Sequence, residues 1–234
     1  MDQILRLHYA PDNASLIVRL ALEELGVPYE TVLVDRSLNA QNGADFLAIN
    51  PAGLIPALET PQGAIFETAA ILLWLSETYN GLAPQPGTPA RANFLKWLFY
   101  LSNTAHTNLR LNFYPEKYIG NEAAAQAKLR KHARANLCDS FDLLETLSQE
   151  GHDWFCGKSV SIIDLYVVAM LRWSAIYPAG DTDWFSLARW SSLNALARNI
   201  ETRPSVASLI KSEGMDICPF STPNYPNPPE GVAI

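Results

Sequence analysis

The feature that most constrains the fold is a segment with two prolines, Asn50 to Leu58, which reads N-P-A-G-L-I-P-A-L. Pro56 follows Ile55 and opens an apolar run. Because proline cannot donate a hydrogen bond to a central strand, we expect it at the first residue of a strand or on an edge. An X–Pro bond is also the only peptide bond that adopts the cis form at low cost. A cis bond before Pro56 would turn the N–H and C=O of Ile55 outward, where they can pair with another extended backbone.

A second short segment, Phe66-Glu67-Thr68, follows eight residues after Leu58 and has the character of a helix start. The free N–H groups of a helix N-terminus, together with the threonine hydroxyl, can hold a carboxylate. A backbone clamp next to a carboxylate site suits a short peptide as ligand.

Four segments, in this order and spacing, resemble one known family. Gly43 to Leu58 together with Glu67-Thr68 resembles the glutathione-binding half of cytosolic glutathione S-transferases, with bacterial beta-class members the most similar in pattern. Leu7 to Glu30 is similar to that family's first strand and helix, and Gly157 to Asp164 (G-K-S-V-S-I-I-D) resembles its helix-capping segment. The resemblance covers about residues 4 to 215 and implies glutathione as co-substrate, a detoxifying transferase and a homodimer.

Composition excludes several other classes of protein. With 48% hydrophobic residues the chain can build a real core, and a net charge of -7 disfavours nucleic acid as a partner. The chain contains no run of 18 apolar residues, so we expect no membrane span, and the first residues lack the pattern of a signal peptide. The three scattered cysteines, Cys138, Cys156 and Cys218, fit a reducing cytoplasm and offer no metal site.

Residues 1–80 alternate between strand and helix patterns. We expect strands at Ile4 to His8, Tyr29 to Val34, Ile55 to Leu58 and Ala64 to Phe66, with helices at Ser15 to Leu25 and Thr68 to Thr78. The order β-α-β-(α)-β-β-α predicts a thioredoxin-like α/β domain, in which a parallel β-α-β unit precedes an antiparallel hairpin.

Beyond that domain, strand patterns disappear. Residues 81–89 are rich in proline and glycine and predict a linker, and residues 90–215 predict an all-α helical bundle. Its expected helices are Ala90 to Asn112, Glu122 to Gln149, Ser161 to Ile176, Leu187 to Glu201 and Pro204 to Lys211. Ser161 and Asp164 form a capping-box pattern, S-x-x-D. Residues 216–234 are a Pro-rich tail, expected either to lie over the body or to be mobile.

An enzyme that uses glutathione must lower the pKa of its thiol, which ordinarily lies near 8.5. This requires a hydrogen-bond donor near the sulfur, and the N-terminus of the first helix adds a positive field. The candidate donors are Tyr9, Asn13 and Ser15, which lie between the first strand and that helix. Each also has an ordinary structural interpretation: Tyr9 can pack at a strand end, while Asn13 and Ser15 favour helix N-caps.

The resemblance adds detail at these positions. Where beta-class members carry a cysteine just before a serine, this chain has Ala14-Ser15, which argues against chemistry that needs an enzyme thiol. Tyr9 aligns with a tyrosine that donates to the thiolate in some classes, and Asn13 and Ser15 occupy the region used by serine-type classes. The choice among the three stays open.

The resemblance also implies how glutathione is held. Glu67 pairs with the ammonium of the γ-glutamyl end, and Thr68 binds its carboxylate. Ile55 pairs its backbone with the cysteinyl unit, and Pro56 fixes that geometry. By spacing, His106 matches a histidine that beta-class members place near the sulfur, although a lone helical histidine is more often a packing or surface residue.

The second substrate is harder to predict. Asn103, His106 and Arg110 form one polar stripe on the long first helix of the second domain, facing either the cleft or a dimer partner. Candidate residues for an apolar acceptor pocket are Phe113, Tyr114, Trp173 and Tyr177. Core packing is the commoner role for such side chains.

The leading hypothesis is therefore a glutathione S-transferase that activates the glutathione thiol for attack on a small hydrophobic electrophile. The alternatives are a glutathione-dependent peroxidase, reductase or lyase on the same fold, and a non-catalytic glutathione-binding scaffold. Because a fold does not fix its substrate, the sequence leaves the electrophile open.

Overall fold

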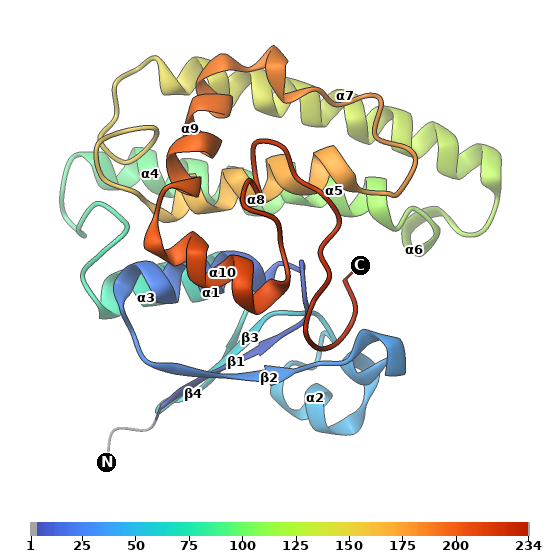
Figure 1. The fold of residues 1–234 in the computed structure, drawn as a ribbon, viewed down its shortest axis with the longest axis horizontal. Coiled ribbons are helices and arrows are strands. Elements are labelled where there is room, and N and C mark those ends of the chain that lie inside the picture. The colour runs from blue at the N-terminus through green and yellow to red at the C-terminus, as the bar shows by residue number, and fades with distance from the viewer. Residues whose placement is uncertain (1–3, 234) are drawn as a thin grey trace.

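A four-stranded mixed sheet forms the base of the molecule in a computed structural model that describes residues 4–233. Its strands are β1 (Leu5–Tyr9), β2 (Tyr29–Leu33), β3 (Ala57–Thr60) and β4 (Gly63–Phe66), in the order β2-β1-β3-β4 (Figure 1). β1 runs parallel to β2 and antiparallel to β3, and β3 pairs antiparallel with β4. The predicted thioredoxin-like arrangement is confirmed.

Helices cover both faces of this sheet. α1 (Ser15–Leu25) and α3 (Thr68–Thr78) lie between the sheet and the helical domain, whereas α2 (Ala44–Ile49) lies on the opposite face (Figure 1). α1 is buried continuously from Ser15 to Leu22, because the sheet contacts one side of it and helices of the second domain contact the other. This double burial explains why apolar residues occupy most of its faces.

The second domain is entirely helical over the residues that the structure describes. It consists of α4 (Ala90–Tyr100), α5 (His106–Phe113), α6 (Glu116–Ile119), α7 (Ala123–Ser148), α8 (Ile162–Ile176), α9 (Ser191–Glu201) and α10 (Pro204–Glu213). Short 3-10 turns occur at Arg36–Leu38, Ala40–Asn42 and Leu187–Arg189. The expected helix from Leu187 therefore begins as such a turn, and its α-helical part starts at Ser191.

A π-helical turn, Leu101–Ala105, joins α4 to α5 and divides what the sequence predicts as one helix. Such a wide turn shifts the side chains that follow it, and π-turns are frequent at functional sites. Here it directly precedes His106.

The central helix α8 begins with the predicted capping box. The Ser161 hydroxyl oxygen accepts a hydrogen bond from the Ile163 N–H at 3.0 Å, and an Asp164 carboxylate oxygen accepts from the Ser161 N–H at 2.8 Å. The cap is therefore confirmed in both directions.

The C-terminal segment lies over the body of the protein, alongside the helical domain and down to the strand ends (Figure 1). The Asn227 N–H donates to the Gly214 carbonyl at 2.8 Å, and the side chain of Phe220 is fully buried. Of the two expectations for this segment, the structure shows the first.

Candidate active site

A cleft of about 300 Å³ opens where the strand ends and helix starts of the first domain face α5 and α8. Its lining combines the two segments that the sequence singles out with the polar stripe of the second domain. The lining residues used below are Asn13, Ala14, Arg36, Ile55, Pro56, Glu67, Thr68, His106, Arg110, Phe113, Tyr114, Lys117, Tyr166 and Trp173. The Ile55–Pro56 bond, which lies in this lining, is cis.

Glu67 and Thr68 form the start of α3 at the cleft. Glu67 is the N-cap residue and has a φ of 72°, a backbone conformation that residues other than glycine rarely adopt. Such outliers cluster at ligand sites, where the surrounding structure holds them in place. The Glu67 side chain is exposed at the cleft, and Thr68 is buried beneath it.

Of the three candidate thiol donors, only Asn13 lines the cleft. Its side-chain oxygen accepts a hydrogen bond from the Ala14 N–H at 2.7 Å, which leaves the amide NH2 group as its donor. Asn13 immediately precedes Ala14, the N-cap residue of α1, so the positive end of that helix acts at the same place.

Ser15 lies inside the first domain, and its side chain is fully buried. Its hydroxyl donates to the Ala10 carbonyl at 3.0 Å and accepts from the Ala10 N–H at 3.3 Å. Both bonds close the turn between β1 and α1, which is a structural role.

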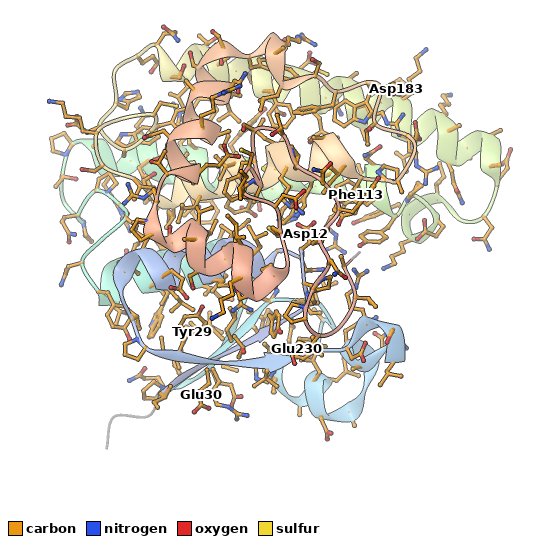
Figure 2. All side chains as sticks on the ribbon, viewed as in Figure 1. Asp12, Tyr29, Glu30, Phe113, Asp183 and Glu230 are labelled. Carbon is orange, nitrogen blue, oxygen red and sulfur yellow. The ribbon has the colours of Figure 1, made fainter. Side chains whose placement is uncertain are left out.

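Tyr9 is also buried, at 2% exposure, and its hydroxyl donates a hydrogen bond to Glu230 in the C-terminal segment. Figure 2 shows Glu230 on the loop that descends to the strand ends. The Arg19 guanidinium lies 4.6 Å from the centre of the Tyr9 ring. Burial, followed by the Glu230 carboxylate, raises the pKa of the Tyr9 hydroxyl, which therefore remains protonated.

His106 lines the cleft from the second domain. Its Nδ1 lies 2.8 Å from the Tyr166 hydroxyl, and its ring also packs against Trp173. Burial, and then the positive charge of Arg110, lowers the pKa of His106 to about 4. His106 is therefore a neutral imidazole at neutral pH, able to donate or accept one hydrogen bond but unable to supply a charge.

The aromatic residues expected around the second substrate divide between two cavities. Phe113, Tyr114 and Trp173 line the cleft itself. Tyr177 lines a neighbouring cavity of about 280 Å³, which Phe113 also borders. The rest of its lining comes from two residues that follow Tyr177 and three of the C-terminal segment: Pro178, Ala179, Tyr225, Pro226 and Ala233.

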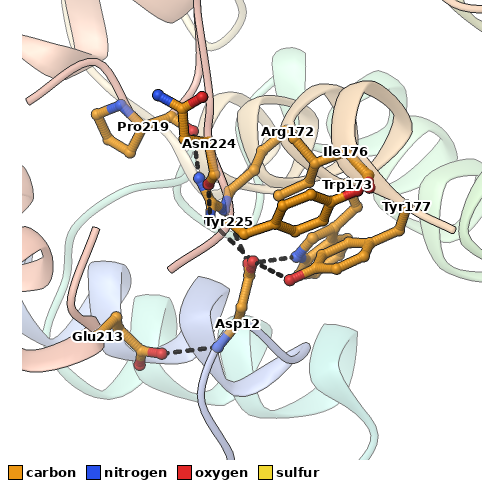
Figure 3. Close-up of polar contacts among 9 residues, drawn as sticks. All are labelled: Asp12, Arg172, Trp173, Ile176, Tyr177, Glu213, Pro219, Asn224 and Tyr225. Atoms are coloured by element: carbon orange, nitrogen blue, oxygen red, sulfur yellow. Dashed lines mark hydrogen bonds and ion pairs between the residues drawn. The ribbon is translucent and has the colours of Figure 1, made fainter. Parts of the chain in front are cut away.

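Sequence reasoning missed a buried polar network centred on Asp12, the residue before Asn13 (Figure 3). Asp12 is fully buried, and its carboxylate accepts from Arg172 Nε and Nη2 at 2.8 Å each. It also accepts from Trp173 Nε1 at 2.9 Å and from the Tyr177 hydroxyl at 2.7 Å. The loop that carries Asn13 is thereby fixed to α8.

The same network reaches the C-terminal segment and α10. Arg172 Nη1 donates to the Pro219 carbonyl at 2.9 Å, and Nη2 donates to the Asn224 carbonyl at 3.2 Å. The Asp12 N–H donates to Glu213 at 2.8 Å, and Glu213 in turn accepts from Arg19 Nε at 2.9 Å. One sequence signal pointed to this network: Arg172 interrupts an apolar helix, and a buried arginine requires a partner.

The described residues also include three cysteines, which do not form a cluster suited to a metal ion. Residues 4–233 contain no group of three or more side chains suited to holding a metal ion, and no helix among them is long and apolar enough to cross a membrane. The three cysteines are free. Burial raises the pKa of Cys156 to about 12, so its thiol is a poor nucleophile.

A thioredoxin-like domain followed by a helical domain, with the cleft between them, defines the class of glutathione S-transferase folds. The family model for the glutathione S-transferase N-terminal domain matches residues 14–78, and the model for the C-terminal domain matches residues 106–213. The chain belongs to the glutathione S-transferase family, a family of transferases.

Individual relatives agree with this assignment. A glutathione S-transferase of Xanthomonas campestris is 26% identical over 91% of this chain and 100% of its own length. A sphingomonad glutathione S-transferase in complex with glutathione is 30% identical, with a TM-score of 0.73, over 89% of this chain and 98% of that one. A beta-class glutathione S-transferase of Sphingomonas chungbukensis is 29% identical, with a TM-score of 0.71 and the same coverage. The predicted likeness to bacterial beta-class members is confirmed.

Proposed function

We propose that this protein binds glutathione in the cleft and activates its thiol for conjugation to a hydrophobic electrophile. The observation that carries the proposal is the convergence of the Ile55–Pro56 segment, Glu67-Thr68 and Asn13 on one cavity. The relatives strengthen it, since a solved neighbour at 30% identity contains glutathione.

The first domain would hold the tripeptide by its two ends and its middle. The Glu67 carboxylate pairs with the γ-glutamyl ammonium, while Thr68 and the N-terminus of α3 bind the adjoining carboxylate. The backbone of Ile55 pairs with that of the cysteinyl residue. This arrangement directs the thiol toward Asn13 and the start of α1.

We assign thiol activation to Asn13 rather than to Tyr9 or Ser15. Asn13 offers a free amide donor at the cleft, whereas the hydroxyls of Tyr9 and Ser15 are bonded elsewhere. A hydrogen bond to the charged form lowers the pKa of an acid, and so does a nearby helix N-terminus. Both effects act on the glutathione sulfur, and His106 faces the same cavity as a neutral hydrogen-bonding partner.

In the conjugation step the glutathione thiolate attacks an electrophilic carbon of the second substrate. A sulfur–carbon bond forms, and a leaving group such as chloride departs with its bonding electrons. The cleft offers Phe113, Tyr114 and Trp173 as apolar surface for that substrate. The thiol proton passes to solvent when glutathione binds.

The proposal is tested with purified protein, glutathione and chlorodinitrobenzene as a generic electrophile. We expect Asn13→Ala to lower kcat/KM about 10- to 100-fold, as expected for one hydrogen bond to a charged group. Tyr9→Phe and Ser15→Ala serve as matched comparisons, with glutathione affinity and thiolate absorbance measured on each variant.

Glutathione binding without turnover of any electrophile would favour the scaffold alternative. Turnover of peroxides or disulfides in place of the electrophile would favour a reductase. An Asn13→Ala variant with an unchanged thiol pKa would overturn the assignment of the donor.

We also propose that the protein is a homodimer in the cytoplasm. Apolar side chains are exposed at Phe66, at the end of β4, and at Phe99 on α4. The free cysteines suit a reducing compartment. Light scattering on the purified protein gives the molar mass in solution, and a mass equal to that of a single chain would overturn the proposal of a dimer.

A further inference from the structure

The charge of the cleft differs from that of the protein as a whole. The chain carries a net charge of -7, yet three cationic side chains, Arg36, Arg110 and Lys117, line the cleft together with a single carboxylate, Glu67. Since His106 is neutral, the cleft has a clear excess of positive charge. Among residues 4–233, none of the three cations forms an ion pair with a carboxylate.

Tyr114 brings two of these cations together from different domains. Arg36, from the segment after β2, donates through Nη2 to the Tyr114 hydroxyl at 3.1 Å. Lys117, on α6, places its Nζ 4.3 Å from the centre of the Tyr114 ring. In addition, Arg36 Nη1 is buried and has no hydrogen-bond partner within the described residues. A buried, unpartnered guanidinium nitrogen at a cavity indicates an anionic ligand.

Arg110 lies on the same side of α5 as His106, because the two are four residues apart on one helix. Both line the cleft. Arg110 and Lys117 thus belong to the second domain, on the side where Phe113 and Tyr114 provide the apolar surface for the acceptor.

Glutathione alone does not account for three cations. One of its two carboxylates would bind at Thr68, and its ammonium would neutralise Glu67. The other carboxylate needs one cation, and Arg36 is the one supplied by the domain that holds the tripeptide. Arg110 and Lys117 remain.

We infer that Arg110 and Lys117 bind a carboxylate on the molecule that meets the glutathione thiol, so that the enzyme selects anionic second substrates. This inference rests on the proposed function and specifies the class of its substrate. The carboxylate has two sources: an aryl or alkyl electrophile that bears an acid group, or a second glutathione, which would occupy the acceptor site as a ligand without reacting. The apolar part of the electrophile lies against Phe113 and Tyr114, and the acid group of either molecule faces the two cations.

The test compares two electrophiles of nearly equal shape, a chloronitrobenzoate and the corresponding chloronitrobenzamide. Each kcat/KM is divided by the uncatalysed rate with glutathione, because the two chlorides differ in intrinsic reactivity. We expect the wild type to prefer the benzoate, and Arg110→Gln or Lys117→Gln each to lower that preference about tenfold, equivalent to about 1.4 kcal/mol. Added salt should weaken the preference, because it screens the charges.

Two further variants make the result specific. Lys131→Gln removes the same charge from an exposed position on α7, outside the cleft, and should leave the preference unchanged. Arg110→Lys retains the charge and should restore most of the preference that Arg110→Gln loses. Calorimetry with glutathione alone separates the two sources: two molecules per chain in wild type and one in the variants would identify the second tripeptide as the ligand.

A preference and a glutathione stoichiometry that are the same in wild type, Arg110→Gln and Lys117→Gln would overturn the inference, provided that the benzamide is conjugated. Failure of wild type to bind glutathione would instead overturn the proposed function, and the inference with it. The two failures are therefore distinguishable.

Discussion

Replacing Asp12 by asparagine removes the negative charge that the buried Arg172 contacts, while leaving the size of the side chain almost unchanged. In the native protein the carboxylate accepts four hydrogen bonds, two from Arg172 and one each from Trp173 and Tyr177. The oxygen of an asparagine can accept some of these hydrogen bonds. Its NH2 group, however, takes the place of the second carboxylate oxygen and faces N–H or O–H groups that also donate. The arginine charge then remains buried without a counter-charge.

The magnitude follows from the burial of both partners. Asp12 and Arg172 are each 0% exposed, so solvent cannot replace the lost partner. Removing one member of such a pair typically costs about 3–5 kcal/mol in the free energy of unfolding. Since a domain is stable by only about 5–15 kcal/mol, we expect Asp12→Asn to remain folded but to unfold at a much lower urea concentration.

Urea unfolding, followed by tryptophan fluorescence, measures this loss for wild type and variant. Asp183→Asn is the matched control, since Asp183 is exposed at the periphery of the helical domain (Figure 2) and should change stability by less than about 0.5 kcal/mol. Asp12→Asn should also weaken glutathione binding, because the network fixes the loop that carries Asn13. A loss of stability below about 1 kcal/mol would refute the reasoning.

Three further predictions concern acid stability, helix capping and the C-terminal segment. Because the folded pKa of His106 is about 4 and its ordinary value is 6.5, the unfolded chain binds a proton between these pH values that the folded chain does not. The free energy of unfolding should therefore fall as the pH drops from 6.5 to 4, by up to about 3 kcal/mol from this residue. In urea titrations over the same pH range, the free energy of unfolding of His106→Gln should fall by less. Ser161→Ala should cost about 1–2 kcal/mol in thermal or urea unfolding, because it removes the cap of α8; a Ser161→Thr variant that is no better than alanine would contradict this. Tyr9→Phe should increase protease cleavage within residues 216–234, because Glu230 loses its hydrogen bond. If the variant and the wild type are cleaved at equal rates, the Tyr9–Glu230 bond does not hold this segment in place.

Much of the fold could be predicted because its signals are local. The alternation of strand and helix patterns in the first 80 residues, the antiparallel hairpin within them and the Ser161–Asp164 cap all depend on neighbours a few residues away. The interruption of one helix was not predicted: the helix expected over Ala90 to Asn112 contains a π-helical turn, because the sequence pattern there is the same as that of a regular helix.

The cleft was predicted in part. Asn13, Ile55, Pro56, Glu67, Thr68 and His106 all line it, as the motifs and the family resemblance led us to expect. The sequence could not separate Asn13 from Tyr9 and Ser15, because all three lie in or directly beside the short turn between β1 and α1. Only the packing of that turn shows which polar groups are already bonded and which one faces the cavity.

The sequence by itself determined the order of elements, the two-domain character and the segments that line the cleft, since periodicity, capping and proline act over short distances. The tertiary structure alone decided that Asp12 meets Arg172 from 160 residues away, that Tyr9 binds the C-terminal segment, and that three cations gather in an acidic protein. Contacts of this kind depend on how surfaces that are distant in the sequence pack together, and no local sequence pattern predicts that packing.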